Sequence, residues 1–206
     1  MTKRDAKRQA ILDTAFRLFI AQGFDGTSVS QINAEVGGSK ATIYSHFPSK
    51  EELFVECMTA AVDDYITAIS EHGATQLETS GVGPETLLRD YGISYLKLVC
   101  SSDIVATRRL MIAEAARAGI GKLFLAKIAA MRAHAVAFLS RLMTFGALRP
   151  DDAGLAAEHL RALLEAELIE PLLLDARDTP PADSEIAFAV ERAISAFLRA
   201  YAPVSP

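Results

Sequence analysis

The 206-residue chain lacks the features that mark several common protein classes. Its two cysteines, Cys57 and Cys100, are far apart and form no Cys-x-x-Cys pair, so the sequence predicts neither a zinc site nor a disulfide framework. Positive charge is also scarce, because 21 Lys and Arg residues against 26 Asp and Glu residues give a formal net charge of −5. By charge alone, the chain is unlike a nucleic-acid binder.

A long apolar run and an apolar leader are absent as well. No stretch of about 18 or more apolar residues occurs, and residues 1–8 are too polar for a secretory signal. We therefore expect no membrane contact, and reduced, buried thiols in a cytoplasmic protein. Half of the residues are hydrophobic, which is enough for a folded core and argues against disorder.

The net charge is unevenly distributed along the chain. Residues 1–50 carry a formal charge of +3, whereas residues 51–206 carry −8. This asymmetry predicts a short cationic module joined to an acidic body. We accordingly expect one domain at 1–50 and a second at 51–206.

Apolar residues recur with helical spacing between Gly and Pro breaks, and no segment alternates like a strand. The pattern predicts an all-α fold of about nine helices. Gly23 and Gly73 are expected to end helices, and residues 73–84 are expected to form a linker with Pro84 in the first turn of the next helix. Later helices are expected at about 85–100, 103–118, 120–145, 152–176 and 184–202.

The second and third predicted helices have the spacing of a helix-turn-helix. Ser28 followed by Gln31 is a capping box that opens a short helix. A Gly-Gly pair at 37–38 ends this helix after about two turns, and Ser39 can cap the next one. Such a pair can place its second helix in a DNA major groove, although two short helices around a glycine also suit ordinary packing.

These residues resemble a known family. The run TSVSQINAEVGGSKATIYSHFPSKEEL at 27–53 is similar to the signature of TetR/AcrR-family transcriptional regulators. The upstream runs ILDTAFRLF at 11–19 and GFDGT at 23–27 match the first helix of the family and its exit. The resemblance implies a three-helix DNA-binding head followed by a helical bundle for effector binding and dimerisation.

The resemblance also implies a ligand-responsive repressor. Such a protein binds a palindromic operator in double-stranded DNA as a homodimer and is released by a small-molecule effector. The residues expected at base edges or at the start of the recognition helix are Ser39, Lys40, Ala41 and Thr42. Those expected near the phosphate backbone are Thr27, Ser28, Tyr44, His46 and Lys50. Those expected to hold the head together are Ile32, Ile43, Phe47 and Leu53.

Three positions depart from the family pattern. Asn33 and Val36 stand where the family usually has alanines, and Gly38 stands where it usually has an apolar turn residue. These departures bear on the tightness and angle of the turn. The cationic residues at 3–8 allow two interpretations, a solvated and frayed terminus or an arm that touches DNA.

The acidic body offers a candidate effector site for a small apolar or amphipathic ligand. Apolar bulk with isolated polar groups is typical of ligand sites in helical bundles, although each such residue also suits an ordinary core. The candidates are Tyr91, Tyr95, Met111, Phe124, Met131, His134 and Phe138.

The last two predicted helices carry more apolar surface than one partner helix needs. The family resemblance implies a four-helix dimer interface built from two copies of this pair, and burial within one chain is the alternative. The candidate interface residues are Leu155, Leu163, Leu164, Leu168, Ile186, Val190, Ile194 and Phe197.

Two other functions fit the sequence less well. An all-α enzyme has little support, because the four histidines show no HExxH pairing, no GxSxG elbow occurs, and no metal or cofactor is expected. A protein-interaction adaptor that keeps the head without DNA affinity is suggested by Gly38 alone.

Overall fold

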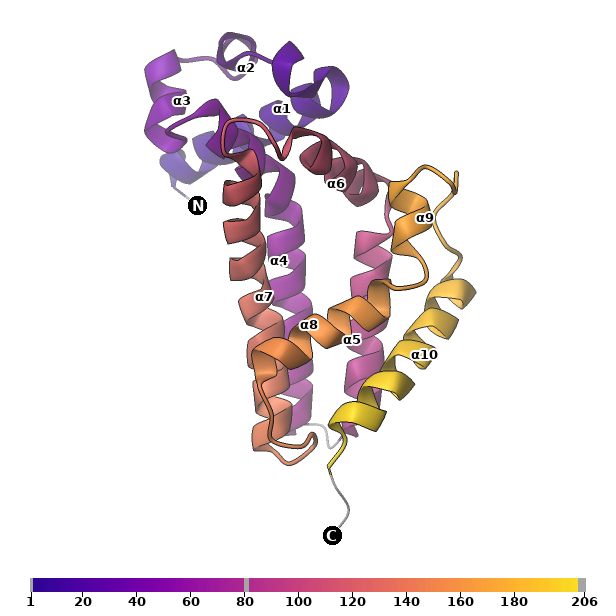
Figure 1. Cartoon of the computed structure of the whole chain (residues 1–206). Coiled ribbons are helices and arrows are strands. Elements are labelled where there is room, and N and C mark those ends of the chain that lie inside the picture. Colours follow the sequence, from indigo (N-terminus) through magenta and orange to yellow (C-terminus); the bar gives the residue numbers. More distant parts are fainter. Residues whose placement is uncertain (1, 80–81, 204–206) are drawn as a thin grey trace. The chain divides into compact units, whose positions relative to one another are not determined.

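The computed structural model describes residues 2–79 and 82–203 and is all-α across them (Figure 1). This part of the chain forms ten labelled helices, of which the first contains two helical segments joined at Gly23. The helices are α1 (Lys3–Gly26), α2 (Val29–Val36), α3 (Lys40–His46), α4 (Lys50–Thr79), α5 (Pro84–Val99), α6 (Ser102–Glu114), α7 (Ile120–Thr144), α8 (Ala153–Glu165), α9 (Ile169–Leu173) and α10 (Asp183–Tyr201). The predicted fold class is confirmed, but the predicted number of helices was too low.

One additional helix arises in the stretch 152–176, for which a single helix was expected. α8 ends at Glu165, and α9 begins at Ile169, two residues before Pro171. Proline has no amide hydrogen and its ring clashes with the carbonyl four residues earlier, so it is tolerated in the first turn of a helix but not in its interior. The chain therefore starts a new helix around Pro171 instead of extending α8.

The helices form two compact units. The head unit comprises residues 1–61 and 106–128, and the body unit comprises residues 62–105 and 129–206. The head unit thus includes the start of α4, most of α6 and the start of α7 in addition to α1, α2 and α3. These units are defined by packing, so the predicted functional division after residue 50 stays a prediction.

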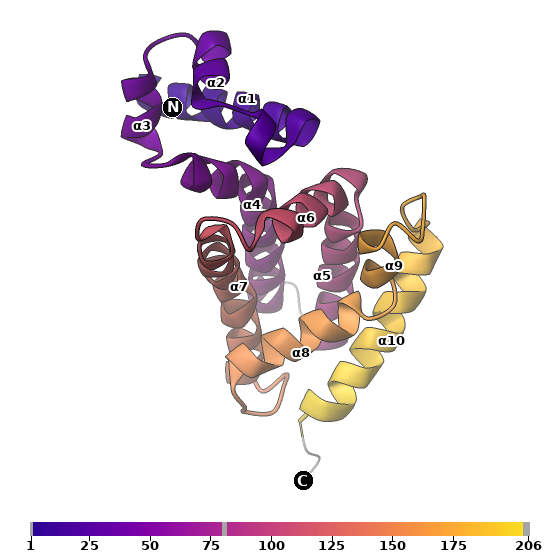
Figure 2. The ribbon, with the colours of Figure 1, turned by 45° about the horizontal axis from the view of Figure 1, so that its top comes forward.

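The core of the head unit is built around three phenylalanines. Phe54 is fully buried and lies edge-on to Phe19 and Phe24, with ring centroids 5.0 and 5.2 Å from its own. The residues predicted to hold the head together all belong to the same buried cluster: Ile32, Ile43, Phe47 and Leu53. α2 and α3 are therefore anchored on the core that α1 and α4 form (Figure 2).

Glycine has two different roles at the predicted helix ends. Gly23 adopts a φ of +71° and breaks α1, as expected for a position that favours glycine. Gly73 instead lies inside α4, where a Cβ atom would come within 2.9 Å of Phe138 Cε2. The expected linker was therefore wrong over 73–79, because Gly73 permits close packing, and residues 80 and 81 lie outside the described part. Pro84 opens α5 as predicted.

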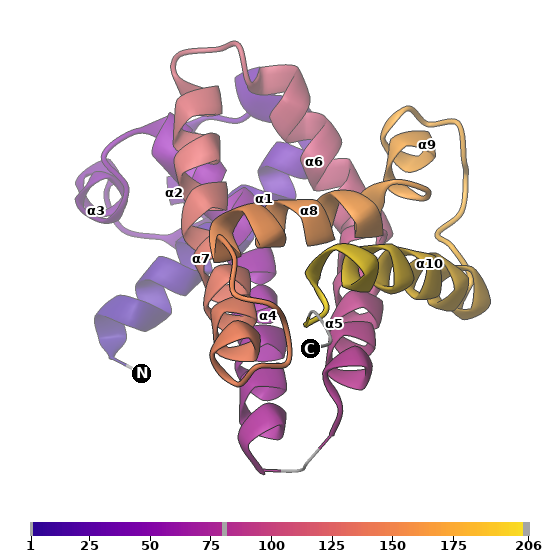
Figure 3. The same ribbon diagram turned by 60° about the horizontal axis from the view of Figure 1, so that its bottom comes forward.

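The core of the body unit is formed mainly by α5, α8 and α10, together with the C-terminal part of α7 (Figure 3). Cys100 lies in this core, and Cys57 lies in the core of the head unit. Both cysteines are buried, as predicted, and neither belongs to a disulfide in the described part of the chain. Burial raises the pKa of the Cys57 thiol well above its usual value, so this thiol is protonated and unreactive at neutral pH.

α7 is long and apolar enough to cross a membrane by length and composition alone. An apolar 18-residue window of this helix is 17% buried. Core helices of soluble proteins can pass the same test, and Phe138, Leu139 and Leu142 of α7 are buried in the body core. The helix is therefore weak support for a membrane span.

Candidate nucleic-acid interface

Serine caps fix the starts of both helices of the predicted helix-turn-helix. The Gln31 amide donates to Ser28 Oγ at 3.2 Å, and the Ser28 amide donates to Gln31 Oε1 at 2.7 Å. The Thr42 amide donates to Ser39 Oγ at 3.2 Å. Both predicted caps are confirmed, and they satisfy amides that the first turns would otherwise leave unpaired.

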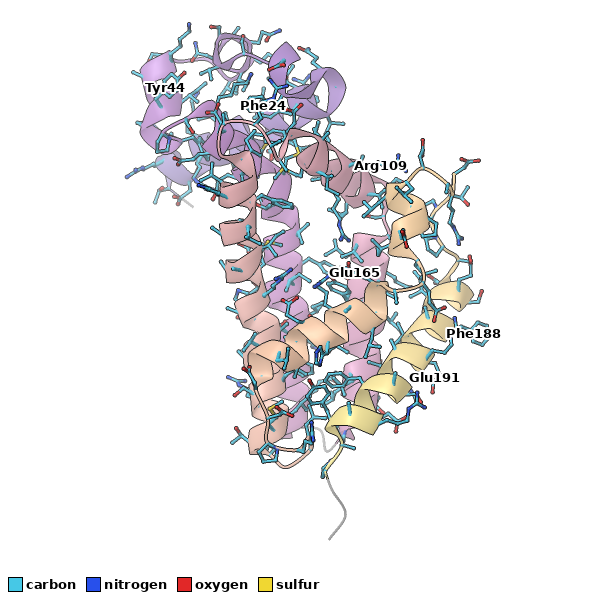
Figure 4. The ribbon with its side chains drawn as sticks, viewed as in Figure 1. Phe24, Tyr44, Arg109, Glu165, Phe188 and Glu191 are labelled. Atoms are coloured by element: carbon cyan, nitrogen blue, oxygen red, sulfur yellow. The ribbon has the colours of Figure 1, made fainter. Side chains whose placement is uncertain are left out.

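The outer face of α3 is polar and open to solvent. Lys40 and Ala41 are exposed, and Tyr44 exposes 47% of its surface (Figure 4). On the opposite side, Ile43 is buried in the head core and anchors the helix. Thr42 is half-buried, with its hydroxyl 3.0 Å from Ser39 Oγ. α3 can therefore present small and hydrogen-bonding side chains to a base edge while its inner face stays fixed.

Thr27 and Ser28 lie between α1 and α2. Thr27 is fully buried, and its hydroxyl donates to the carbonyl oxygen of Gly23 at 2.9 Å. Its side chain therefore stabilises the exit from α1, and this geometry does not favour the predicted phosphate contact. Ser28 is exposed at the start of α2, and the N-terminus of a helix favours an anion. Ser28 is therefore better placed than Thr27 for the predicted phosphate contact.

Lys50 and His46 are less open than residues of the α3 surface. Lys50 is half-buried, and its Nζ lies 4.1 Å from the centroid of the Phe24 ring. Burial lowers the pKa of Lys50, although the carboxylates of Asp25 and Glu51 oppose this change. Its ammonium group therefore has a cation–π partner within the head, and a phosphate would have to draw it away from the ring. His46 is half-buried at the end of α3.

The cationic N-terminal residues belong to α1. The amide of Thr2 donates to Asp5 Oδ2 at 2.9 Å and the amide of Asp5 donates to Thr2 Oγ1 at 3.1 Å, which forms a capping box. The hydrogen bond from the Thr2 amide lowers the pKa of Asp5. One turn later, Lys7 donates to the backbone at the end of α2, and Arg8 pairs with a glutamate of α4 at 2.8 Å. The frayed-terminus interpretation is therefore wrong for Lys7 and Arg8.

Comparison with known proteins places both parts of the chain in one group. Residues 86–203 match the family model of the AefR-like transcriptional repressor C-terminal domain, and residues 11–57 match that of the bacterial regulatory proteins of the tetR family. The chain belongs to the TetR family. The family resemblance that the sequence predicted is thus confirmed, and the chain is a DNA-binding transcriptional regulator of the TetR family, not an enzyme.

Several TetR-family structures resemble the chain over nearly its whole length. A TetR-family transcriptional regulator from Mesorhizobium loti MAFF303099 is 26% identical with a TM-score of 0.82, and it aligns over 98% of this chain and 100% of its own. The flavonoid-responsive regulator FrrA is 28% identical with a TM-score of 0.70 and the same coverage.

Curated relatives match over a smaller part of the chain. YxaF of Bacillus subtilis, an uncharacterized regulator, is 44% identical over 73 residues, which is 35% of this chain and 36% of that protein. The repressor ComR of Escherichia coli is 31% identical over 99 residues, which is 48% of this chain and 45% of ComR. The chain therefore matches less than half the length of these relatives.

The residues predicted to bind an effector are divided between the two units. Met111 and Phe124 lie in the head unit, and the others lie in the body unit: Tyr91, Tyr95, Met131, His134 and Phe138. Tyr91 stacks on Tyr95 and on Phe138, with ring centroids 6.2 and 5.5 Å apart. Burial raises the pKa of Tyr91 to about 12, so its hydroxyl is neutral at physiological pH.

A polar group borders this aromatic stack. The hydroxyl of Tyr95 donates to Glu165 Oε1 at 2.5 Å, and Arg161 donates to Glu165 Oε2 at 3.3 Å. A cleft of about 440 Å³ lies elsewhere in the body unit and is lined by other residues: Lys97, Cys100, Ser101, Ser102, Asp103, Pro180, Pro181, Asp183 and Ile186. The effector site at the stack thus stays a prediction.

The residues predicted at a dimer interface lie mostly inside the body unit. Those buried in its core are Leu164, Leu168, Ile186, Val190, Ile194 and Phe197, while Leu163 is half-buried. Leu155 exposes 50% of its surface. Two apolar residues that the sequence did not single out are more exposed, Phe188 at 64% and Leu174 at 71%. Helical periodicity identified the buried side of α10, and Phe188 lies on its outer side (Figure 4).

Proposed function

We propose that the chain is a homodimeric, ligand-responsive repressor in the cytoplasm, which binds a palindromic operator through α3. The observation that carries this proposal is the polar, open face of α3, on a helix whose start is capped and whose inner face is buried. A two-fold dimer would present two such helices about one DNA turn apart, which is about 34–36 Å. Each half-site of the operator would then receive one α3.

The distribution of charge supports DNA binding through the head. Residues 1–50, which contain the helix-turn-helix, have a formal charge of +3 and residues 51–206 have −8, so the overall −5 reflects the residues that follow the helix-turn-helix. An acidic body repels DNA away from the operator contact, while the exposed Lys40 attracts phosphates at α3. This arrangement favours a specific contact over general adhesion to DNA.

Dimerisation is supported by the outer side of the body unit. Phe188 exposes 64% of its surface on α10, and the charged residues one turn later are paired: Glu191 with Arg89 at 2.7 Å, and Arg192 with Glu167. An apolar centre within a charged rim is the usual composition of a protein interface. We therefore assign the dimer contact to the outer side of α10, with Leu155 of α8 as a further apolar contribution.

The effector proposal rests on the aromatic stack of the body unit. Tyr91, Tyr95 and Phe138 offer ring faces, and the Tyr95–Glu165 pair offers polar atoms beside them. FrrA, a relative of similar length, is named as flavonoid-responsive. We propose that the effector is a small planar aromatic molecule with hydroxyl groups. It releases DNA by preferring a body conformation that is incompatible with operator binding, because only differential affinity for the two states shifts the equilibrium.

A Tyr44→Ala variant tests the site on α3. The operator is first selected from a pool of random duplexes with the unaltered protein. Loss of an exposed tyrosine that contacts phosphate is expected to lower affinity for the selected duplex about tenfold, as the loss of one good hydrogen-bonded contact does. Tyr65→Ala removes another exposed tyrosine, which lies on α4 in the body unit, and should leave affinity unchanged. Equal affinities for Tyr44→Ala and the unaltered protein in a gel shift would contradict the α3 assignment.

Thermal unfolding tests the effector proposal. A soluble flavonoid present at about 100 times its dissociation constant stabilises the state that binds it by about 2.7 kcal/mol, which corresponds to a rise of about 5–10 °C in Tm for a chain of this size. Tyr91→Ala should abolish the rise, while Tyr65→Ala should retain it. A rise that survives Tyr91→Ala would place the ligand elsewhere in the protein.

A further inference from the structure

The side chain of Lys7 crosses from α1 to the end of α2. Its Nζ donates to the carbonyl oxygen of Val36 at 2.9 Å and to that of Gly37 at 2.6 Å. These two residues are the last of α2 and its cap. Carbonyls at a helix C-terminus have no partner within the helix, and they form the negative end of its dipole, so an ammonium group is a favourable partner there.

The next carbonyl along the chain is held by a second side chain. Asn33 Nδ2 donates to the carbonyl oxygen of Gly38 at 3.3 Å. Three consecutive carbonyl oxygens, those of residues 36, 37 and 38, therefore accept hydrogen bonds from Lys7 or Asn33. We call this arrangement the turn clamp.

The two residues of the turn have no side chains that could fix its shape. Gly37 and Gly38 adopt φ values of +74° and +113°, which other residues rarely adopt, and neither offers a side chain for packing. Ser39 follows directly and caps α3. The backbone that the turn clamp holds is thus the segment that sets where α3 begins and in which direction it leaves α2.

We infer that Lys7 is a positioning residue for DNA recognition, which fixes the angle of α3 through the turn clamp and does not itself contact DNA. The inference rests on the proposed binding through α3. Two of the three hydrogens of the ammonium group already have backbone acceptors, and the residue is only half-exposed. Its loss should therefore weaken discrimination between sequences more than it weakens attraction to phosphates.

The test compares Lys7→Met with Lys3→Met. Both variants remove one positive charge from the first two turns of α1, but the exposed side chain of Lys3 makes no hydrogen bond within the described part of the chain. Affinity is measured for the duplex selected by the unaltered protein and for a scrambled duplex of the same length, each over a series of salt concentrations. Hydrogen exchange of the DNA-free protein is measured over residues 37–43.

Lys7→Met is expected to lower affinity for the selected duplex about tenfold, which is the scale of one good base contact. Its affinity for the scrambled duplex and its salt dependence should match those of Lys3→Met. Hydrogen exchange over 37–43 should rise in Lys7→Met but not in Lys3→Met. Lys7→Arg, which keeps the donors, should restore both the affinity for the selected duplex and the protection of 37–43 from exchange. Asn33→Ala should also lower the affinity for the selected duplex and raise exchange over 37–43, which provides the test of the turn clamp if Lys7→Met fails to fold.

Two results would overturn the inference. If Lys7→Met weakens both duplexes equally and reduces the salt slope by about 0.9 per head relative to Lys3→Met, Lys7 is a phosphate contact. If exchange over 37–43 is unchanged in Lys7→Met, the turn clamp does not hold the turn. Failure of the unaltered protein to select any duplex counts against the proposed function alone, because the exchange measurement still tests the turn clamp.

Discussion

Replacing Phe188 with aspartate is expected to separate the dimer into single chains and to lower operator affinity at least about 100-fold. Phe188 exposes 64% of its surface on α10, so its removal creates no cavity in the body core. In a dimer interface, however, the new carboxylate would be buried without a partner, which strongly opposes association. Loss of the second head then removes the gain in affinity that comes from binding two half-sites with one molecule.

Sedimentation equilibrium measures the first effect, and a gel shift on the selected duplex measures the second. Leu125→Asp is the matched control, because Leu125 is as exposed as Phe188, at 62%, but lies on α7 in the head unit. The control should remain a dimer with unaltered affinity. A dimeric Phe188→Asp protein would place the interface on another surface.

The local elements of the head could be predicted because their signals are local. Ser28 with Gln31 and Ser39 with Thr42 make hydrogen bonds to amides three residues away, which the sequence pattern shows directly. The turn clamp could not be predicted in this way. Lys7 lies 29 and 30 residues before the carbonyls that it binds, so its role depends on how α1 and α2 pack.

Two other features could not be predicted because glycine occurs both at helix ends and at close packing contacts, and because apolar periodicity does not identify the packing partner. Gly73 resembled a helix end because glycine favours turns, but it is also the residue that permits the ring of Phe138 to approach α4. The periodic apolar residues of α10, such as Ile194, were expected at a dimer interface, with burial within one chain as the alternative, and they are buried in the body core. Periodicity shows that a face is buried but not against which partner, so burial within the body unit was not distinguished from burial in a dimer.

Phe54→Ala is expected to lower the free energy of unfolding by about 3–5 kcal/mol, the cost of emptying a phenylalanine site in a core. Phe54 is fully buried, and its ring lies edge-on to both Phe19 and Phe24. The resulting cavity would also remove a packing partner of Phe24, whose ring makes the cation–π contact with the ammonium group of Lys50. Phe54→Leu retains most of the volume and should cost less than about 1.5 kcal/mol. Urea denaturation measures both variants.

The same variant links the core to DNA recognition. Ile43 and Phe47, which hold α3 and its end, are buried in the cluster that contains Phe54. A cavity there should let α3 shift, so operator affinity should fall in Phe54→Ala even under conditions in which the protein remains folded by circular dichroism. Phe197→Ala empties an equally buried site in the body unit and should cost similar stability. In folded Phe197→Ala, hydrogen exchange should rise in the body unit and stay unchanged over residues 37–43. If both variants raised exchange at α3 equally, the head core would not be the part of the protein that specifically positions the recognition helix.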